Sequence, residues 1–178
     1  LAHPLVHRFR ANAATVVTCC RALRRMGWRL DDEAVRAGLA QGGWPGRMER
    51  LADAPVVVAD GAHNVEAVRE LVREFARFDP RPVVVFGAMR DKDLSGMLAL
   101  LRTHAAALVL TRAPSSRAAG AEEFTPFLSL SGVTYREDPG QALAEARALA
   151  GPGGRVVVAG SLYLVAAIKR WLAEEGAA

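Results

Sequence analysis

Short apolar runs that alternate with amphipathic segments constrain this chain most strongly. Six of these runs are predicted to be strands, at residues 48–51, 56–59, 83–86, 107–110, 133–135 and 156–159. Five helices are predicted between and after them, at residues 64–78, 94–102, 120–128, 139–149 and 162–173. Several runs are almost wholly apolar, which is typical of parallel strands that are buried on both faces. The pattern therefore predicts an α/β fold, a Rossmann-like, mostly parallel six-stranded sheet with helices on both faces.

The first quarter of the chain has a different pattern and is predicted to be helical. Its apolar residues recur at helical spacing, Gly27 is expected to end one helix, and Asp31 or Asp32 is expected to cap a second. The chain is therefore divided into a short helical segment at residues 1–43 and an α/β domain at residues 44–178.

The composition of the chain limits its cellular location and its binding partners. The longest apolar runs are too short to span a bilayer, so no membrane partner is predicted. Cys19 and Cys20 are adjacent, which suits neither a disulfide nor a metal site, so we expect buried, reduced thiols in a cytoplasmic protein. The formal net charge of +4 originates in residues 1–50, where nine arginines face four acids. Because these arginines form no dense run with interleaved aromatic residues, we interpret them as a solvated helix face and predict no nucleic-acid partner.

Polar loops that contain glycine follow three of the predicted strands. They read DGAHN at residues 60–64, GAMRDKD at residues 87–93 and GSLY at residues 160–163, and WPGR at residues 44–47 adds an arginine nearby. Parallel strands end at the same edge of a sheet, so we expect the three loops to open onto one edge. Each loop leads into a helix N-terminus, where backbone N–H groups favour an anion. The edge therefore suits the phosphate or ribose of a nucleotide.

A further loop, at residues 114–120, is predicted to be a mobile part of the surface.

Taken singly, the polar residues of these loops have plainer roles. Asn64 and Asp93 could be ordinary helix caps, and Asp60 could cap its own turn. A lone histidine such as His63 is more often structural than catalytic, and Ser161 could be another cap. It is their convergence on one edge that favours a functional site.

Motifs for other chemistries are missing from the sequence. There is no GxxxxGK[ST] phosphate loop, no GxGxxG after a strand and no GxSxG elbow. No cluster of His, Cys or carboxylate residues has the spacing of a metal site, so no metal ligand is predicted in this chain.

WPGR, DGAHN, FGAMRDKD and GSLY occur in an order and at a spacing that identify a family. They resemble the C-terminal part of bacterial folylpolyglutamate synthase/dihydrofolate synthase, a relative of the Mur peptide ligases, and the resemblance covers nearly the whole chain. It implies an ATP-dependent ligase that phosphorylates the terminal carboxylate of dihydropteroate or a folyl-glutamate. The amino group of L-glutamate then attacks the acyl phosphate, which gives an amide, ADP and phosphate. The implied cofactors are ATP and Mg²⁺.

The resemblance also implies roles for single residues. Asn12 matches the asparagine that contacts the adenine, and Arg47 matches the arginine that reaches the ribose or the phosphates. Asp60 matches the carboxylate that accepts from the ribose hydroxyls, and His63 matches the histidine beside the reacting groups, which makes it the catalytic candidate.

The incoming glutamate has four candidate contacts. Ser161 and Tyr163 match a pair near the incoming amino acid. Lys92 and Arg90 are candidate partners of a glutamate carboxylate because of their place in the loop after the third strand.

The same resemblance implies that part of the enzyme lies outside this chain. The phosphate loop and the magnesium ligands of the family belong to a larger N-terminal domain, which would be a partner of this chain. Residues 1–43 match the last helices of the family's central ATPase domain and the hinge, so the chain alone is expected to be inactive. Three alternatives stay open: a stand-alone nucleotide-binding module, a structural or interaction domain whose basic N-terminal helices dock an acidic partner, or a fragment of a Mur-type cell-wall peptide ligase.

Overall fold

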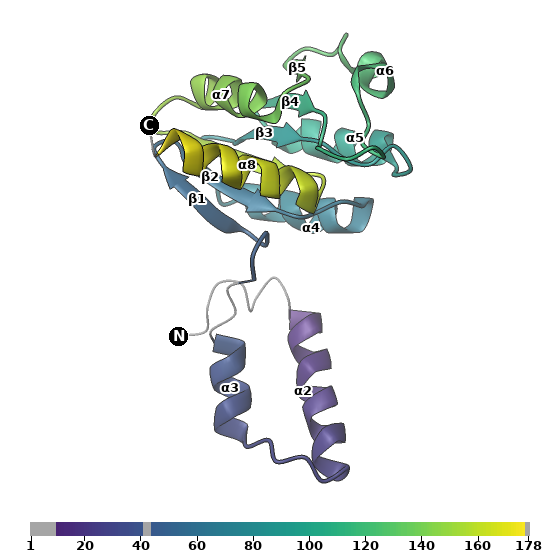
Figure 1. Ribbon diagram of the computed structural model, residues 1–178, viewed down its shortest axis with the longest axis vertical. Helices are drawn as coiled ribbons and strands as arrows, with labels where there is room; N and C mark the ends of the chain where they lie inside the picture. The colour runs from purple at the N-terminus through teal and green to yellow at the C-terminus, as the bar shows by residue number, and fades with distance from the viewer. Residues whose placement is uncertain (1–9, 41–43, 177–178) are drawn as a thin grey trace. The chain divides into compact units, whose positions relative to one another are not determined.

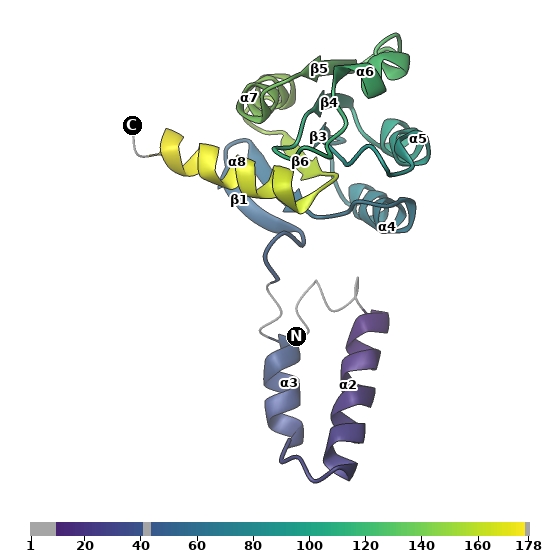
Figure 2. The same ribbon diagram turned by 45° about the vertical axis from the view of Figure 1, so that its right-hand side comes forward.

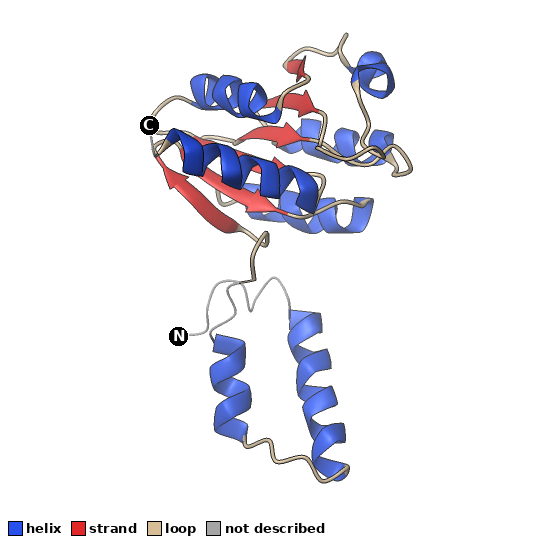
Figure 3. Ribbon diagram, viewed as in Figure 1, coloured by secondary structure: helices blue, strands red, loops and turns tan. Residues whose placement is uncertain are grey.

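The computed structural model describes residues 10–40 and 44–176 of the chain (Figure 1). Its contacts divide the chain into two compact units, Leu1–Pro45 and Gly46–Ala178. In its described residues the first unit is helical, whereas the second is a sheet with helices on both faces (Figure 3).

The helical unit contains α2 (Arg10–Arg25) and α3 (Asp32–Ala40). Gly27 adopts a φ of +92° directly after α2, the left-handed conformation that commonly ends helices, and this confirms its predicted role. Asp31 Oδ1 accepts a hydrogen bond from the Ala34 N–H at 2.6 Å, so Asp31 is the cap of α3.

No described side chain of the helical unit is fully buried. Cys19 is exposed and Cys20 is only partly buried, so the prediction of two buried thiols is wrong. Val16, Met26 and Trp28 are exposed as well. These two helices therefore do not form a hydrophobic core by themselves.

The second unit is built on a six-stranded sheet with the strand order β1-β2-β6-β3-β4-β5. The strands are β1 (Glu49–Asp53), β2 (Val56–Asp60), β3 (Val83–Phe86), β4 (Ala107–Thr111), β5 (Val133–Arg136) and β6 (Arg155–Ala159). β1 pairs antiparallel with β2, and every other neighbouring pair is parallel. The predicted six-stranded, mostly parallel sheet is confirmed. β1 lies slightly later than predicted because it pairs with the whole length of β2.

Helices cover both faces of this sheet, as Figure 2 shows. One face carries α4 (Val65–Phe75), α5 (Leu94–His104), α6 (Ala121–Phe124) and the 3-10 helix η1 (Thr125–Phe127), and the other carries α7 (Pro139–Ala150) and α8 (Leu162–Glu175). The side chains of β3 alternate between the two apolar clusters, one on each face of the sheet. Val84 and Phe86 belong to the cluster under α4 and α5, whereas Val83 and Val85 belong to the cluster under α7 and α8.

The segment after β4 differs from its prediction. The predicted helix is a short α6 that passes into η1, because Pro126 has no N–H to continue an α-helical ladder. The loop at residues 114–120 is not a free surface loop. Ala118 and Ala119 are buried, and the Ala119 N–H donates to the Ala88 carbonyl at 2.9 Å. The prediction of a mobile loop is therefore wrong, because the loop pairs with a neighbour.

Four helices of this unit begin at a side-chain cap in the loop that follows a strand. Asn64, Asp93, Asp138 and Ser161 each accept a hydrogen bond from the backbone N–H three residues later, at 2.8, 2.8, 2.8 and 3.1 Å. The caps predicted at Asn64, Asp93 and Ser161 are thus confirmed. They place the N-termini of α4, α5, α7 and α8 at the carboxyl edge of the sheet, where α/β proteins bind their ligands.

Candidate functional site

Backbone hydrogen bonds join the carboxyl ends of β2, β6 and β3, which are neighbours in the sheet. The Gly160 N–H donates to the Ala62 carbonyl at 2.9 Å, and the Gly87 N–H donates to the Ala159 carbonyl at 3.1 Å. Gly160 has a φ of +113°, and a Cβ placed on it would lie 2.5 Å from the Gly87 carbonyl oxygen. Only glycine fits such an approach. The expectation that the three loops share one edge is confirmed.

Asp60 ends β2 and is completely buried. Its Oδ2 accepts the Met48 N–H at 3.1 Å and its Oδ1 accepts the Ala62 N–H at 3.0 Å. Arg47 Nη1 lies 4.0 Å from the same Oδ1. Met48 has a φ of +47°, which is uncommon outside glycine, so the buried carboxylate holds a tight turn. The structure brings Arg47 and Asp60 together as predicted, and it gives Asp60 the further task of fixing the turn that carries Arg47.

Glu49 supports the other side of this turn. Its Oε2 accepts the Gly46 N–H at 2.7 Å, and its Oε1 pairs with Lys169 Nζ at 2.7 Å, which ties β1 to α8. The hydrogen bonds from Lys169 and from the Gly46 N–H hold the pKa of Glu49 below its ordinary value. Sequence reasoning missed Glu49, because a pair separated by 120 positions leaves no local pattern.

His63 lies in the turn between β2 and α4 and is exposed. Its Nδ1 is 2.8 Å from the Gly61 carbonyl oxygen. A carbonyl only accepts, so Nδ1 carries the proton in this contact, and Nε2 of the neutral ring is left as an acceptor. The backbone therefore fixes both the orientation and the tautomer of the predicted catalytic residue.

Ser161, Leu162 and Tyr163 form the turn between β6 and α8. Ser161 is buried, and its Oγ accepts the Leu164 N–H, so this hydroxyl already serves as the helix cap. Leu162 and Tyr163 are exposed beside it. The Leu162 side chain lies over Gly61, where a Cβ would come within 2.6 Å of Leu162 Cδ2. Leu162 was not predicted as part of the site, although it lies in the sequence between two predicted site residues, Ser161 and Tyr163.

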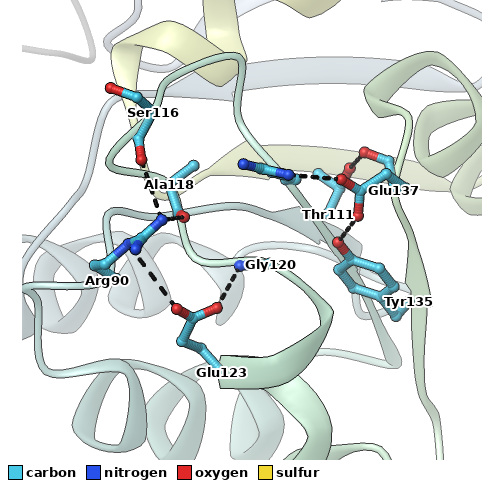
Figure 4. A network of polar contacts seen from close by, with 9 residues as sticks. Arg90, Thr111, Ser116, Ala118, Gly120, Glu123, Tyr135 and Glu137 are labelled. Atoms are coloured by element: carbon cyan, nitrogen blue, oxygen red, sulfur yellow. Dashed lines mark hydrogen bonds and ion pairs between the residues drawn. The ribbon is translucent and has the colours of Figure 1, made fainter.

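The charged residues of the β3–α5 loop are already engaged within the protein. Arg90 Nη2 donates to the Ser116 carbonyl at 3.1 Å and to the Ala118 carbonyl at 3.3 Å (Figure 4). Lys92 Nζ lies 3.5 Å from Asp91 Oδ2. The structure thus directs Arg90 toward the neighbouring loop.

A family model described as Mur ligase, glutamate ligase domain matches residues 46–162, which is more than half of the chain. The chain belongs to this family. The family expected from the resemblance is confirmed.

Individual relatives of this glutamate ligase domain are considerably longer. The Bacillus subtilis protein named dihydrofolate synthase/folylpolyglutamate synthase is 33% identical over 166 residues, which cover 92% of this chain and 39% of the relative. Escherichia coli FolC in complex with ADP has a TM-score of 0.77 and 28% identity, covering 92% of this chain and 40% of its own. A folylpolyglutamate synthase/dihydrofolate synthase with Mn, AMPPNP and L-glutamate bound has a TM-score of 0.74 and 28% identity, covering 88% and 38%. This chain therefore spans about two-fifths of the length of these relatives.

Asn12 lies outside the glutamate ligase domain. It is in α2 of the helical unit, and its side chain is exposed. Its contact with an adenine stays a prediction.

A hollow of about 570 Å³ lies at the same edge of the glutamate ligase domain, between the loops after β4 and β5. Arg112 and Glu137 line it and pair at 3.1 Å, and the Tyr135 hydroxyl donates to Glu137 (Figure 4). Burial and the hydrogen bond to Glu137 raise the pKa of Tyr135 to about 12, so this phenol stays protonated. None of the predicted site residues lines this hollow.

The described residues lack two further features. No group of three or more His, Cys, Asp or Glu side chains there is arranged to hold a metal ion. In the same part of the chain, no helix combines the length and the hydrophobicity that a membrane span requires.

Proposed function

We propose that this chain is the C-terminal part of an ATP-dependent ligase that joins L-glutamate to dihydropteroate or to a folyl-glutamate. Support comes from the names of the relatives and from a similar structure with AMPPNP and L-glutamate bound. Because the chain covers 39% of the Bacillus subtilis relative, the proposal assigns the phosphate loop and the rest of the folate site to residues outside it.

The observation that carries the proposal is the glycine-lined edge where β2, β6 and β3 end. Gly87 and Gly160 let neighbouring turns pass at backbone distance, and Gly61 leaves room for the Leu162 side chain. The N-termini of α4, α5 and α8 follow these turns at the same edge. Each helix N-terminus stabilises a nearby anion by about 0.3–1 kcal/mol. Such an edge suits the anionic groups of this reaction, which are the phosphoryl group and the glutamate carboxylates.

The proposed chemistry depends on positioning more than on covalent catalysis. The terminal carboxylate of the folate substrate becomes an acyl phosphate, and the amino nitrogen of L-glutamate attacks its carbonyl carbon. The C–N bond forms while the C–O bond to phosphate breaks, and the amine loses a proton. We assign the orientation of that amine to His63, whose Nε2 accepts a hydrogen bond because Nδ1 is held by Gly61.

The nucleotide contacts belong to the same proposal. Arg47 reaches the ribose or the phosphates from the turn that Asp60 and Glu49 hold. A contact between Asp60 and the ribose hydroxyls requires the turn at Met48 to move, because Asp60 has no exposed surface in this structure.

A divalent metal ion does not fit the described residues, which contain no suitable cluster of ligands. Mn is present in two similar structures. In this proposal the metal ligands belong to the remainder of the enzyme, and no step at the metal falls to the residues described here.

The test is an assay of the intact native protein. ATP hydrolysis is measured with dihydropteroate and L-glutamate, each omitted in turn, and mass spectrometry identifies the product. We expect hydrolysis only with both substrates, an amide product, and no turnover by the 178-residue chain alone. Use of a UDP-linked peptide instead would show a Mur-type cell-wall ligase, and nucleotide binding without turnover would show a binding module.

A further inference from the structure

Two loops at the carboxyl edge pair with each other although they are far apart in the sequence. The Arg90 N–H donates to the Arg117 carbonyl at 2.9 Å, and the Ala119 N–H donates to the Ala88 carbonyl at 2.9 Å. Met89 forms an antiparallel bridge in the same short stretch. Residues 88–91 and 117–119 therefore make a small two-stranded ribbon, here called the edge ribbon.

Two arginines cross this ribbon in opposite directions. Arg90 leaves the first loop and donates to the Ser116 and Ala118 carbonyls of the second (Figure 4). Arg117 leaves the second loop and donates to Asp91 Oδ1 of the first at 3.2 Å. Each guanidinium thus binds the loop that it does not belong to, and a planar fork of N–H donors suits such a task.

Glu123 extends the clamp to the start of α6. Its Oε2 accepts the Gly120 N–H at 2.8 Å, and its Oε1 lies 3.9 Å from Arg90 Nε (Figure 4). An acid in this place competes with any carboxylate that approaches Arg90. This favours a positioning role for Arg90 over that of a direct carboxylate ligand.

The clamped loop leads directly to the candidate site. It continues through Lys92 to Asp93, the cap of α5. A Cβ on Gly96 would lie 3.0 Å from Val65 Cγ2, so the first turn of α5 packs against the first turn of α4, directly after His63. The place of the edge ribbon therefore sets the place of Lys92 and of the α5 N-terminus relative to His63.

We propose that Arg90 and Arg117 are positioning residues, which clamp the edge ribbon and so place Lys92 and the α5 N-terminus for a carboxylate of the incoming amino acid. Neither arginine touches the substrate. The assignment of that ligand rests on the proposed function, whereas the clamp itself does not.

The clamp is tested on the 178-residue chain by amide hydrogen exchange. Arg90→Met and Arg117→Met should each speed exchange of the Ala119 amide about tenfold or more, because the ribbon opens more often. Arg112→Met is the matched control, since Arg112 is an equally exposed arginine at the same edge that pairs with Glu137. Unchanged protection in both test variants would overturn the clamp.

The positioning role is tested on the intact ligase. Arg90→Met should raise the KM for L-glutamate about tenfold while kcat changes less than about twofold. Arg90→Lys should resemble Arg90→Met, because lysine has one nitrogen, whereas Arg90 uses Nη2 for the two carbonyls and Nε for Glu123. Glu123→Ala should also raise this KM, because it loosens the start of α6.

A direct carboxylate ligand predicts the opposite pattern. Lysine would then restore the wild-type KM at Arg90, and removal of the competing acid at Glu123 would leave the KM unchanged or lower it. If the wild-type intact protein shows no glutamate-dependent turnover, the proposed function fails, while the exchange experiment still decides whether the clamp exists.

Discussion

At the scale of single residues, the site depends on positions where a side chain would not fit or would lose its partners. At Gly160 the backbone passes the Gly87 carbonyl too closely for a Cβ and adopts a left-handed φ. At Asp60 both carboxylate oxygens accept backbone N–H groups inside the protein. These residues shape the edge, and His63 is the exposed group that this shape presents.

Replacement of Gly160 tests the close approach directly. We expect Gly160→Ala to lower the free energy of unfolding by about 2 kcal/mol or more, because strain at positive φ and the clash with Gly87 add. Gly153→Ala is the matched control, since a Cβ there meets no atom within 4 Å, and it should change stability by less than about 0.5 kcal/mol. Urea denaturation followed by circular dichroism measures both, and equal stability of the two variants would contradict the expectation.

His63 is tested by replacement with glutamine in the intact ligase. His63→Gln should lower kcat/KM for L-glutamate about a hundredfold, because the amide oxygen of glutamine is far less basic than the ring nitrogen and is not fixed in place by the contact between the ring and the Gly61 carbonyl. His104→Gln is the control, since His104 Nδ1 contacts the Leu100 carbonyl near the far end of α5. A similar loss in both variants would indicate a structural effect instead of a catalytic one.

At the scale of elements, strand ends and helix caps form the edge of the sheet. The contacts of the edge ribbon then hold two of its loops together. The caps act locally, across three residues, and start the helices in the loops that follow the strands. The edge ribbon acts between loops that are about 26 positions apart, so its stability depends on two backbone hydrogen bonds and on the few charged contacts that cross it.

Those contacts predict a dependence on pH. The hydrogen bond from Arg117 holds the pKa of Asp91 below its ordinary 3.8, and the Gly120 N–H holds the pKa of Glu123 below 4.5. A carboxylate with a lowered pKa stabilises the fold above its unfolded pKa, and this stabilisation is lost as the pH falls through the folded pKa. Ribbon protection should therefore be constant near neutral pH and should fall below about pH 4.

An NMR titration of the Asp91 carboxylate checks this attribution. In Arg117→Met the pKa of Asp91 should move up toward 3.8, because the donor that favours the charged form is gone. In Arg112→Met it should stay where it is in the wild-type chain. An identical Asp91 pKa in wild-type and Arg117→Met protein would contradict an electrostatic contribution of the Arg117–Asp91 contact to the clamp.

At the scale of the whole molecule, the two units differ in what holds them together. Both apolar clusters lie within Gly46–Ala178, where helices bury the two faces of one sheet. The helical unit has no fully buried side chain among its described residues. The sheet unit therefore has the core that an independently folding domain requires.

A shortened chain tests this difference. A protein that begins at residue 44 should unfold cooperatively, with a free energy of unfolding within about 1 kcal/mol of the full chain. A peptide of residues 10–40 should be largely unstructured, because short helices without tertiary packing are marginal in water. Urea titration of the shortened chain and circular dichroism of the peptide measure the two outcomes, and loss of cooperative unfolding in the shortened chain would contradict the assignment.

The sequence by itself determined the number of strands in the sheet, most of the helices between them and the edge that carries the site. Apolar runs such as Val83–Phe86 specify buried strands, and cap residues such as Asn64 and Asp93 specify where helices begin. Both signals act over a few residues, so they can be read without knowing the fold. The same holds for DGAHN, whose place after a strand put His63 at the edge.

Only the tertiary structure decided which partners the polar residues at this edge take. Arg90 was expected to face a substrate carboxylate, but it binds carbonyls 26 and 28 positions away, and Asp60 holds a turn 12 positions before it. The loop at residues 114–120 was expected to be a mobile part of the surface, yet its pairing buries Ala118 and Ala119. Such contacts depend on which strands become neighbours, and no local pattern of residue types records that choice.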